Sequence, residues 1–82
     1  MTVQMSTDGV ILLEGMCPSE DAETVLRYLS SHPTARIDWR ACESAHTAVI
    51  QVLMASRAKL LGAPSGQALR KWVAPALARL LA

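Results

Sequence analysis

The densest group of chemically capable side chains lies between residues 42 and 47, in the stretch Cys-Glu-Ser-Ala-His-Thr. It offers a thiol at Cys42, hydroxyls at Ser44 and Thr47, and an imidazole at His46. A nucleophile of either kind needs a base within hydrogen-bond reach and a third group that orients the base. His46 and Thr47 are adjacent, and neighbouring residues on a helix point about 100° apart. The spacing therefore supplies no base–nucleophile pair, and we do not expect an enzyme.

The thiols and imidazoles are too few and too widely spaced for a metal centre. Cys17 and Cys42 are 25 positions apart, and neither belongs to a CxxC pair. A structural zinc site needs four ligands at tight spacings, and only His32 and His46 could complete one. Arg40 lies near enough to Cys42 in sequence to favour a thiolate, but a small inert thiol is the favoured interpretation. We predict no metal, no other cofactor, and two reduced, part-buried cysteines.

Length and charge restrict the remaining classes of function. A chain of 82 residues has room for one domain, predicted over residues 1–82. The formal net charge is +1, so no strong overall field favours nucleic acid or anionic lipid. Apolar runs such as residues 10–13 fall far short of the roughly 20 residues that a membrane span needs. The start of the chain lacks the basic and apolar regions of a signal peptide, so we expect a cytoplasmic protein without direct membrane insertion.

Alternating apolar and polar residues predict strands in four places. The predicted strands are Thr2–Ser6, Val10–Glu14, Ala35–Arg40 and the short Lys59–Ala63. An Asp-Gly turn at residues 7–9 joins the first two as a hairpin. The second strand is apolar on both faces, which predicts a position inside the sheet.

Three apolar stripes at helical spacing predict three helices. The first begins near Ser19, its predicted cap, and ends at His32-Pro33. The third begins at Pro64-Ser65 with Ser65 as cap, and Pro75 should kink or divide it. The predicted stripes are Ala22, Val25, Leu26 and Leu29; then Ala45, Val49, Val52 and Leu53; then Leu69, Trp72, Val73, Ala76 and Leu80.

This order of elements predicts an α/β fold with a small four-stranded mixed sheet and about three helices. A right-handed crossover places the start of the second helix at the carboxyl end of the third strand. Ligands and switches in open α/β sheets tend to lie at that edge. Ser44 is the predicted cap of the second helix, which would put Thr47 at its third position, close to free backbone N–H groups.

With these elements in view, the chain resembles a STAS (SpoIIAA-like) domain, the module of sulfate transporters and anti-sigma-factor antagonists. The family has a strand ending in an Asp-Leu-Ser-Gly-Val-like run, followed by Asp-Ser-Ser/Ala-Gly-Leu at the opening of a helix. Residues 37–42 stand in place of the first run, and residues 46–50 in place of the second. Asp38 matches the strand-end Asp, and Thr47 takes the position of the phosphorylatable Ser. His46 replaces the family's Asp, Val-Ile replaces Gly-Leu, and the chain is shorter than most members.

The resemblance implies a non-enzymatic signalling module that binds a protein partner at the edge between the third strand and the second helix. The partner would be a serine/threonine kinase that acts as an anti-sigma factor, or a related regulator, with Thr47 as candidate phosphoacceptor. The predicted partner-binding residues are Asp38, Arg40, Ser44, His46, Thr47 and Ile50.

Two alternatives stay open. The chain could instead be a STAS-like structural or regulatory subunit of a lipid-transport ATPase or a chemotaxis-type complex, without phosphorylation. A small enzyme that uses Cys42 or the His46-Thr47 pair is the third hypothesis, and it lacks a third catalytic group. Dimerisation through an exposed edge strand is possible in any of these cases.

Overall fold

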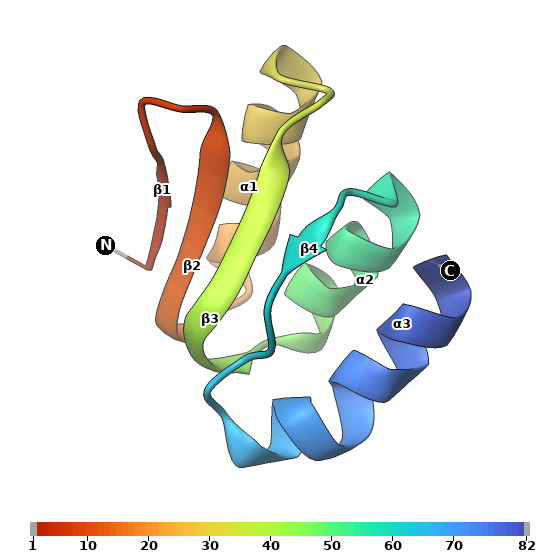
Figure 1. The fold of residues 1–82 in the computed structure, drawn as a ribbon. Coiled ribbons are helices and arrows are strands. Elements are labelled where there is room, and N and C mark those ends of the chain that lie inside the picture. The colour runs from red at the N-terminus through yellow and green to blue at the C-terminus, as the bar shows by residue number, and fades with distance from the viewer. Residues whose placement is uncertain (1, 82) are drawn as a thin grey trace.

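A four-stranded mixed sheet and three helices make up the part of the chain that the structure describes, as the sequence predicts. The computed structural model describes residues 2–81. In chain order the elements are β1 (Val3–Met5), β2 (Val10–Cys17), α1 (Glu20–Ser31), β3 (Arg36–Ala45), α2 (Thr47–Ser56), β4 (Leu60–Leu61), a π-helical turn (Leu69–Val73) and α3 (Ala74–Leu81). Figure 1 shows how they are arranged.

The strands lie in the sheet in their order along the chain, β1-β2-β3-β4. β1 and β2 form the predicted antiparallel hairpin, and Gly9 in its turn has the positive φ of 81° that glycine tolerates. β2 pairs with β3, and β3 with β4, in parallel. β2 therefore lies inside the sheet, as its two apolar faces predict.

Helices α1 and α2 cover one face of the sheet. The two crossovers, through α1 and through α2, step across the sheet in the same direction, so right-handed connections place both helices on the same side (Figure 1). The side chains of Ile11, Leu13, Ile37 and Trp39 face them and are almost completely buried. The opposite face carries a cross-strand row of half-buried or exposed residues, namely Gln4, Leu12, Asp38 and Leu61.

Trp39 is the largest side chain in the core of a protein that has no Phe. It is only 2% exposed, and its indole N–H donates a 2.8 Å hydrogen bond to the carbonyl oxygen of Gly62. The bond satisfies a donor that would be costly to bury alone. It also ties β3 to the residue that follows β4.

β3 is five residues longer at its carboxyl end than the sequence predicts. It continues through Cys42 and Ser44 to Ala45, so these residues belong to a strand and not to a linker. The register against β2 shifts between Leu12 and Glu14, where β3 contains one extra residue. Such a bulge reverses the alternation of faces, which is why the two-residue rhythm of the sequence breaks after Arg40 while Cys42 is still buried.

Ser19 stands at the predicted N-cap position of α1, but its side chain does not cap the helix. Ser19 has helical backbone angles, makes no side-chain cap bond, and donates its hydroxyl to the carboxylate of Glu20 at 2.8 Å. The helix ends at Ser31, directly before His32-Pro33, as predicted. Leu26, placed in the apolar stripe, is 53% exposed because it projects from α1 beside α2 and not onto the sheet.

The last helix departs from its predicted stripe at a π-helical turn. Pro75 has no N–H and would clash with the carbonyl four residues earlier, and the wider turn directly before it relieves both problems. A π-helical turn contains one residue more than an α-helical turn, and this extra residue rotates α3 about its axis. Leu77 is therefore buried where Leu80 was expected, and Trp72 is 70% exposed.

Ser65 is not the cap of this helix. Its hydroxyl and the N–H groups of residues 65 and 66 all donate to the Cys42 carbonyl at 3.1 Å. A Cβ on Gly66 would collide with the Glu43 carbonyl oxygen, so only glycine lets the chain pass this close to β3.

Candidate partner-binding edge

β2 and β3 end side by side, and α1 and α2 begin directly after them. Cys17, the last residue of β2, pairs with Ala45, the last residue of β3. The backbone N–H of His46 then donates to the Cys17 carbonyl at 2.9 Å. We call this region, comprising residues 16–18 and 44–47, the carboxyl edge. It is where the sequence places the start of the second helix.

His46, and not Ser44, caps α2. Its backbone is extended, with φ −60° and ψ 149°, and its ring Nδ1 accepts a 3.0 Å hydrogen bond from the Ala48 N–H. Thr47 is consequently the first helical residue and not the third. Ser44 fails as cap because it is still part of β3, with its backbone engaged by the sheet.

The cap also determines what the His46 ring can do. A neutral imidazole has one acceptor nitrogen, and here the Ala48 N–H occupies it. An imidazolium has no acceptor, so this cap exists only while the ring is neutral. His46 is therefore a structural cap with an exposed ring, and it does not act as a base toward Thr47 in this arrangement.

Thr47 is exposed at the first position of α2. The start of a helix favours negative charge, because the backbone dipoles and unpaired N–H groups point outward there. The first turn of α1 lies nearby. The hydrogen bond from the Ser19 hydroxyl, together with one from the Glu20 backbone, holds the pKa of Glu20 below its ordinary value. An added anion at Thr47 would thus enter a region where two helix starts meet.

Apolar surface adjoins these polar groups. A shallow hollow of about 390 Å³ is lined by Met16, Cys17, Pro18, Ser44, Ala45 and His46. Met16 is 71% exposed, more than any other large apolar side chain in the described part of the chain. Ile50, predicted at the edge, is half-buried and packs against the core. The sequence prediction missed Met16 because it ended β2 at Glu14, although the apolar Met-Cys pair before Pro18 was a visible signal.

Asp38 and Arg40 lie elsewhere. They occupy the middle of β3 on the face that the helices leave open, and seven residues separate Asp38 from the end of the strand, roughly 20 Å at the rise of a strand. The Arg40 guanidinium donates to the Asp38 carboxylate at 2.7 and 3.0 Å and holds the pKa of Asp38 below its ordinary value. The structure does not bring this ion pair together with Thr47.

The two cysteines, distant in sequence, meet in the core. Their Sγ atoms are 3.9 Å apart, and both side chains are buried free thiols. The hydrogen bond to Cys42, together with burial, raises the pKa of the Cys17 thiol well above its ordinary value. No set of three or more His, Cys, Asp or Glu side chains within residues 2–81 could hold a metal ion.

Comparison of the chain with protein-family models, with curated proteins and with solved structures finds no match. None of the helices within residues 2–81 has both the length and the apolar character to cross a membrane.

Proposed function

We propose that this protein is a non-enzymatic signalling module of STAS type, resembling an anti-sigma-factor antagonist, that binds a protein partner through the carboxyl edge. The observation that carries the proposal is the opening of α2. The helix begins at Thr47 behind the cap residue His46, where the resemblance puts the Asp-Ser pair that opens a helix. Thr47 is exposed there and accessible to a kinase.

Phosphorylation of Thr47 would switch this surface by changing its charge. A phosphate adds a charge of about −1.5 to −2, and the start of α2 accommodates it without loss of the fold. The same charge would follow directly after His46, which lines the apolar hollow together with the exposed Met16. Desolvating a phosphate against a partner is costly, so the modified protein releases a partner that packs on Met16.

The proposed partner is a serine/threonine kinase that also acts as an anti-sigma factor, or a related regulator. The proposed contact comprises Ser44, His46 and Thr47 together with Met16, and the Asp38–Arg40 pair lies outside it. We place the protein in the cytoplasm. Two free thiols 3.9 Å apart suit a reducing compartment.

Quantitative affinity capture from native cell lysate tests this proposal, with phosphopeptide mapping of the chain. Thr47→Glu introduces the charge, Thr47→Gln is the neutral control of equal length, and Met16→Asp disrupts the apolar contact. We expect one partner to be recovered by wild type and by Thr47→Gln, and to be lost with Thr47→Glu and with Met16→Asp. Phosphate on Thr47 in the native protein completes the expected result.

A second candidate function uses the same edge without phosphorylation. The exposed Met16 beside its hollow favours it, because a permanent subunit contact would cover such apolar surface. The protein would then be a structural or regulatory subunit of a transporter or chemotaxis-type complex. Equal recovery with Thr47→Glu, loss with Met16→Asp and no phosphate on Thr47 would replace the first candidate by this one.

A further inference from the structure

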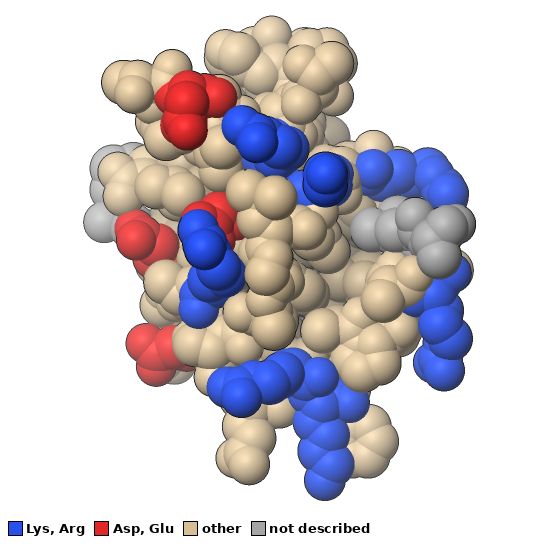
Figure 2. Space-filling view, viewed as in Figure 1, with Lys and Arg blue, Asp and Glu red and all other residues tan. Residues whose placement is uncertain are grey.

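The charges of this protein are divided between its two halves, although their sum is only +1. Residues 1–43 contain seven acidic and three basic side chains, for a net charge of −4, whereas residues 44–82 contain five basic and no acidic ones, for +5. Figure 2 shows the consequence on one face of the molecule. The acidic side chains lie over the half that holds β1 and β2, and Lys and Arg surround the half that holds α2, β4 and α3.

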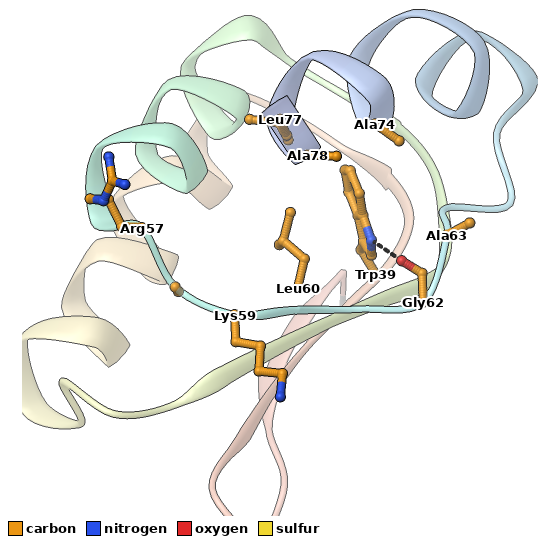
Figure 3. A pocket seen from close by; sticks show the side chains of 10 residues that line it. Trp39, Arg57, Lys59, Leu60, Gly62, Ala63, Ala74, Leu77 and Ala78 are labelled. Atoms are coloured by element: carbon orange, nitrogen blue, oxygen red, sulfur yellow. Dashed lines mark hydrogen bonds between the residues drawn. The ribbon is translucent and has the colours of Figure 1, made fainter. Parts of the chain in front are cut away.

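An apolar hollow opens within the basic half, between β4 and α3. Its volume is about 500 Å³. The half-buried Leu60 and Ala74 line its accessible walls, whereas Leu77 and Trp39, 1% and 2% exposed, lie beneath them in the core. Figure 3 shows Leu60 pointing from β4 toward Leu77 and Ala78 on α3. The volume lies within the range of sites that hold a bound group, and it accommodates an apolar side chain with adjoining backbone.

Cations stand at the rim of this hollow. Arg57 and Lys59 belong to its lining, and both are exposed. Figure 3 shows the Lys59 side chain leaving the chain on the side opposite Leu60, so its charge lies outside the hollow. Two other basic residues are engaged within the chain, since Arg70 donates to the carbonyls of residues 64 and 65, and Lys71 lies 5.2 Å from the centre of the Trp72 ring. Arg57 and Lys59 are therefore the exposed charges that flank the hollow.

We propose that this hollow, flanked by Arg57 and Lys59, binds an acidic extended polypeptide segment that inserts an apolar side chain against Leu60. Charge complementarity selects the acidic chain, and the apolar walls select the inserted side chain. β4 is the last strand of the sheet, so an extended segment can lie alongside it.

The recessed shape of the site favours a polypeptide over other anions. Nucleic-acid binding rests mainly on phosphate contacts, which would leave the accessible apolar wall at Leu60 uncovered. A membrane surface is contacted by apolar groups that project, whereas this wall lies between two elements. This surface is also distinct from the carboxyl edge. Arg57 follows the last residue of α2, about 15 Å along the helix from Thr47.

Titration of the full chain with a short peptide of glutamates flanking a single leucine tests the proposal. The indole N–H signal of Trp39, observed by NMR, reports on the hollow, and that of Trp72 is the internal control because Trp72 lies outside the lining. Lys59→Glu removes a rim charge, and Arg27→Glu makes the same charge change on the exposed surface of α1. Arg57 has a positive φ of 54°, so Arg57→Asn is the variant that keeps its backbone unstrained.

We expect the peptide to shift the Trp39 signal and not that of Trp72. Lys59→Glu should weaken binding about tenfold, Arg57→Asn should weaken it measurably, and Arg27→Glu should change it by less than about twofold. Replacing the peptide's leucine by alanine should also weaken binding. An unchanged Trp39 signal, or equal losses with Lys59→Glu and Arg27→Glu, would overturn the proposal. Tighter binding of duplex DNA or anionic vesicles at the same signal would overturn the polypeptide as the occupant.

Discussion

The two faces of β3 are built from alternate residues of one strand, yet they differ in burial and in the contacts that hold their side chains. Ile37 and Trp39 face the helices and are held in place by burial on every side. Asp38 and Arg40, their sequence neighbours, face away from the helices and bond mainly to each other at the surface. Residues that are close in sequence can therefore share a strand without sharing a site. The proximity of Asp38 and Thr47 along the chain does not place them on the same surface.

The difference between the faces also shows where side chains can change without loss of the fold. The helix-facing side tolerates little change, because each of its residues packs against several elements. The open side can change its charges at small cost to the fold. The carboxyl edge, where both faces end, combines the two kinds of surface in Met16 and Thr47.

The largest expected difference in unfolding free energy is between variants of the two tryptophans. Trp39→Ala should destabilise the fold by about 3–5 kcal/mol, because it empties a large buried volume and leaves the Gly62 carbonyl without its donor. Trp72→Ala, at a side chain that is 70% exposed, is the matched control and should cost far less. Urea denaturation measures both. Equal losses in the two variants would mean that Trp39 is not the centre of the core.

Substitutions of Cys42, on the same buried side, should have an intermediate effect on stability. Cys42→Ser places a more strongly polar hydroxyl beside the Cys17 thiol and should destabilise the fold by about 1–3 kcal/mol, more than the control Cys42→Ala, as measured by urea denaturation. A serine variant as stable as the alanine variant would show that the site accepts a polar group.

The reactivity of the same thiol is a second readout. The hydrogen bond with Cys17 lowers the pKa of the Cys42 thiol, but its side chain is completely buried. Because burial denies access to the reagent, the native chain should react with iodoacetamide more slowly than free cysteine at neutral pH. Faster reaction at Cys42 would restore the hypothesis of a catalytic nucleophile.

The smallest expected effect on stability comes from a substitution on the open face of the sheet. The Arg40 guanidinium lowers the pKa of Asp38, so this pair stabilises the fold above the ordinary Asp pKa of about 3.9 and loses its effect as the pH falls through the lowered value. The difference in unfolding free energy between wild type and Asp38→Asn should be small at pH 7 and should shrink further only below about pH 4. A large difference at neutral pH, or one that persists in strong acid, would show that Asp38 does more than pair with Arg40.

The sequence predicted the order of elements and the α/β class because each long element has a clear hydrophobic rhythm. It erred where that rhythm is interrupted. The bulge in β3 concealed five residues of strand, which moved the helix cap from Ser44 to His46. The turn before Pro75 rotated the last helix, which exchanged Leu80 for Leu77 in the core. Both errors come from extra residues, two in β3 opposite β2 and one in the π-helical turn, and their effect on a periodic pattern is not local.

The candidate site was predicted in part. The position of Thr47 at the start of a helix follows from local pattern, whereas Met16 comes from a different strand and joins it only through the pairing of β2 with β3. The concentration of positive charge in the second half was present in the composition, but the net charge of +1 concealed it.

Local periodicity and residue type were sufficient for the kinds of element, their order and most of the buried face, because these depend on interactions between neighbours along the chain. Contacts between distant residues decided the rest. They brought Cys17 against Cys42, separated Asp38 from Thr47, and left a hollow between β4 and α3. Such outcomes depend on strand register and on the path of each crossover, which only the packing of the whole chain determines.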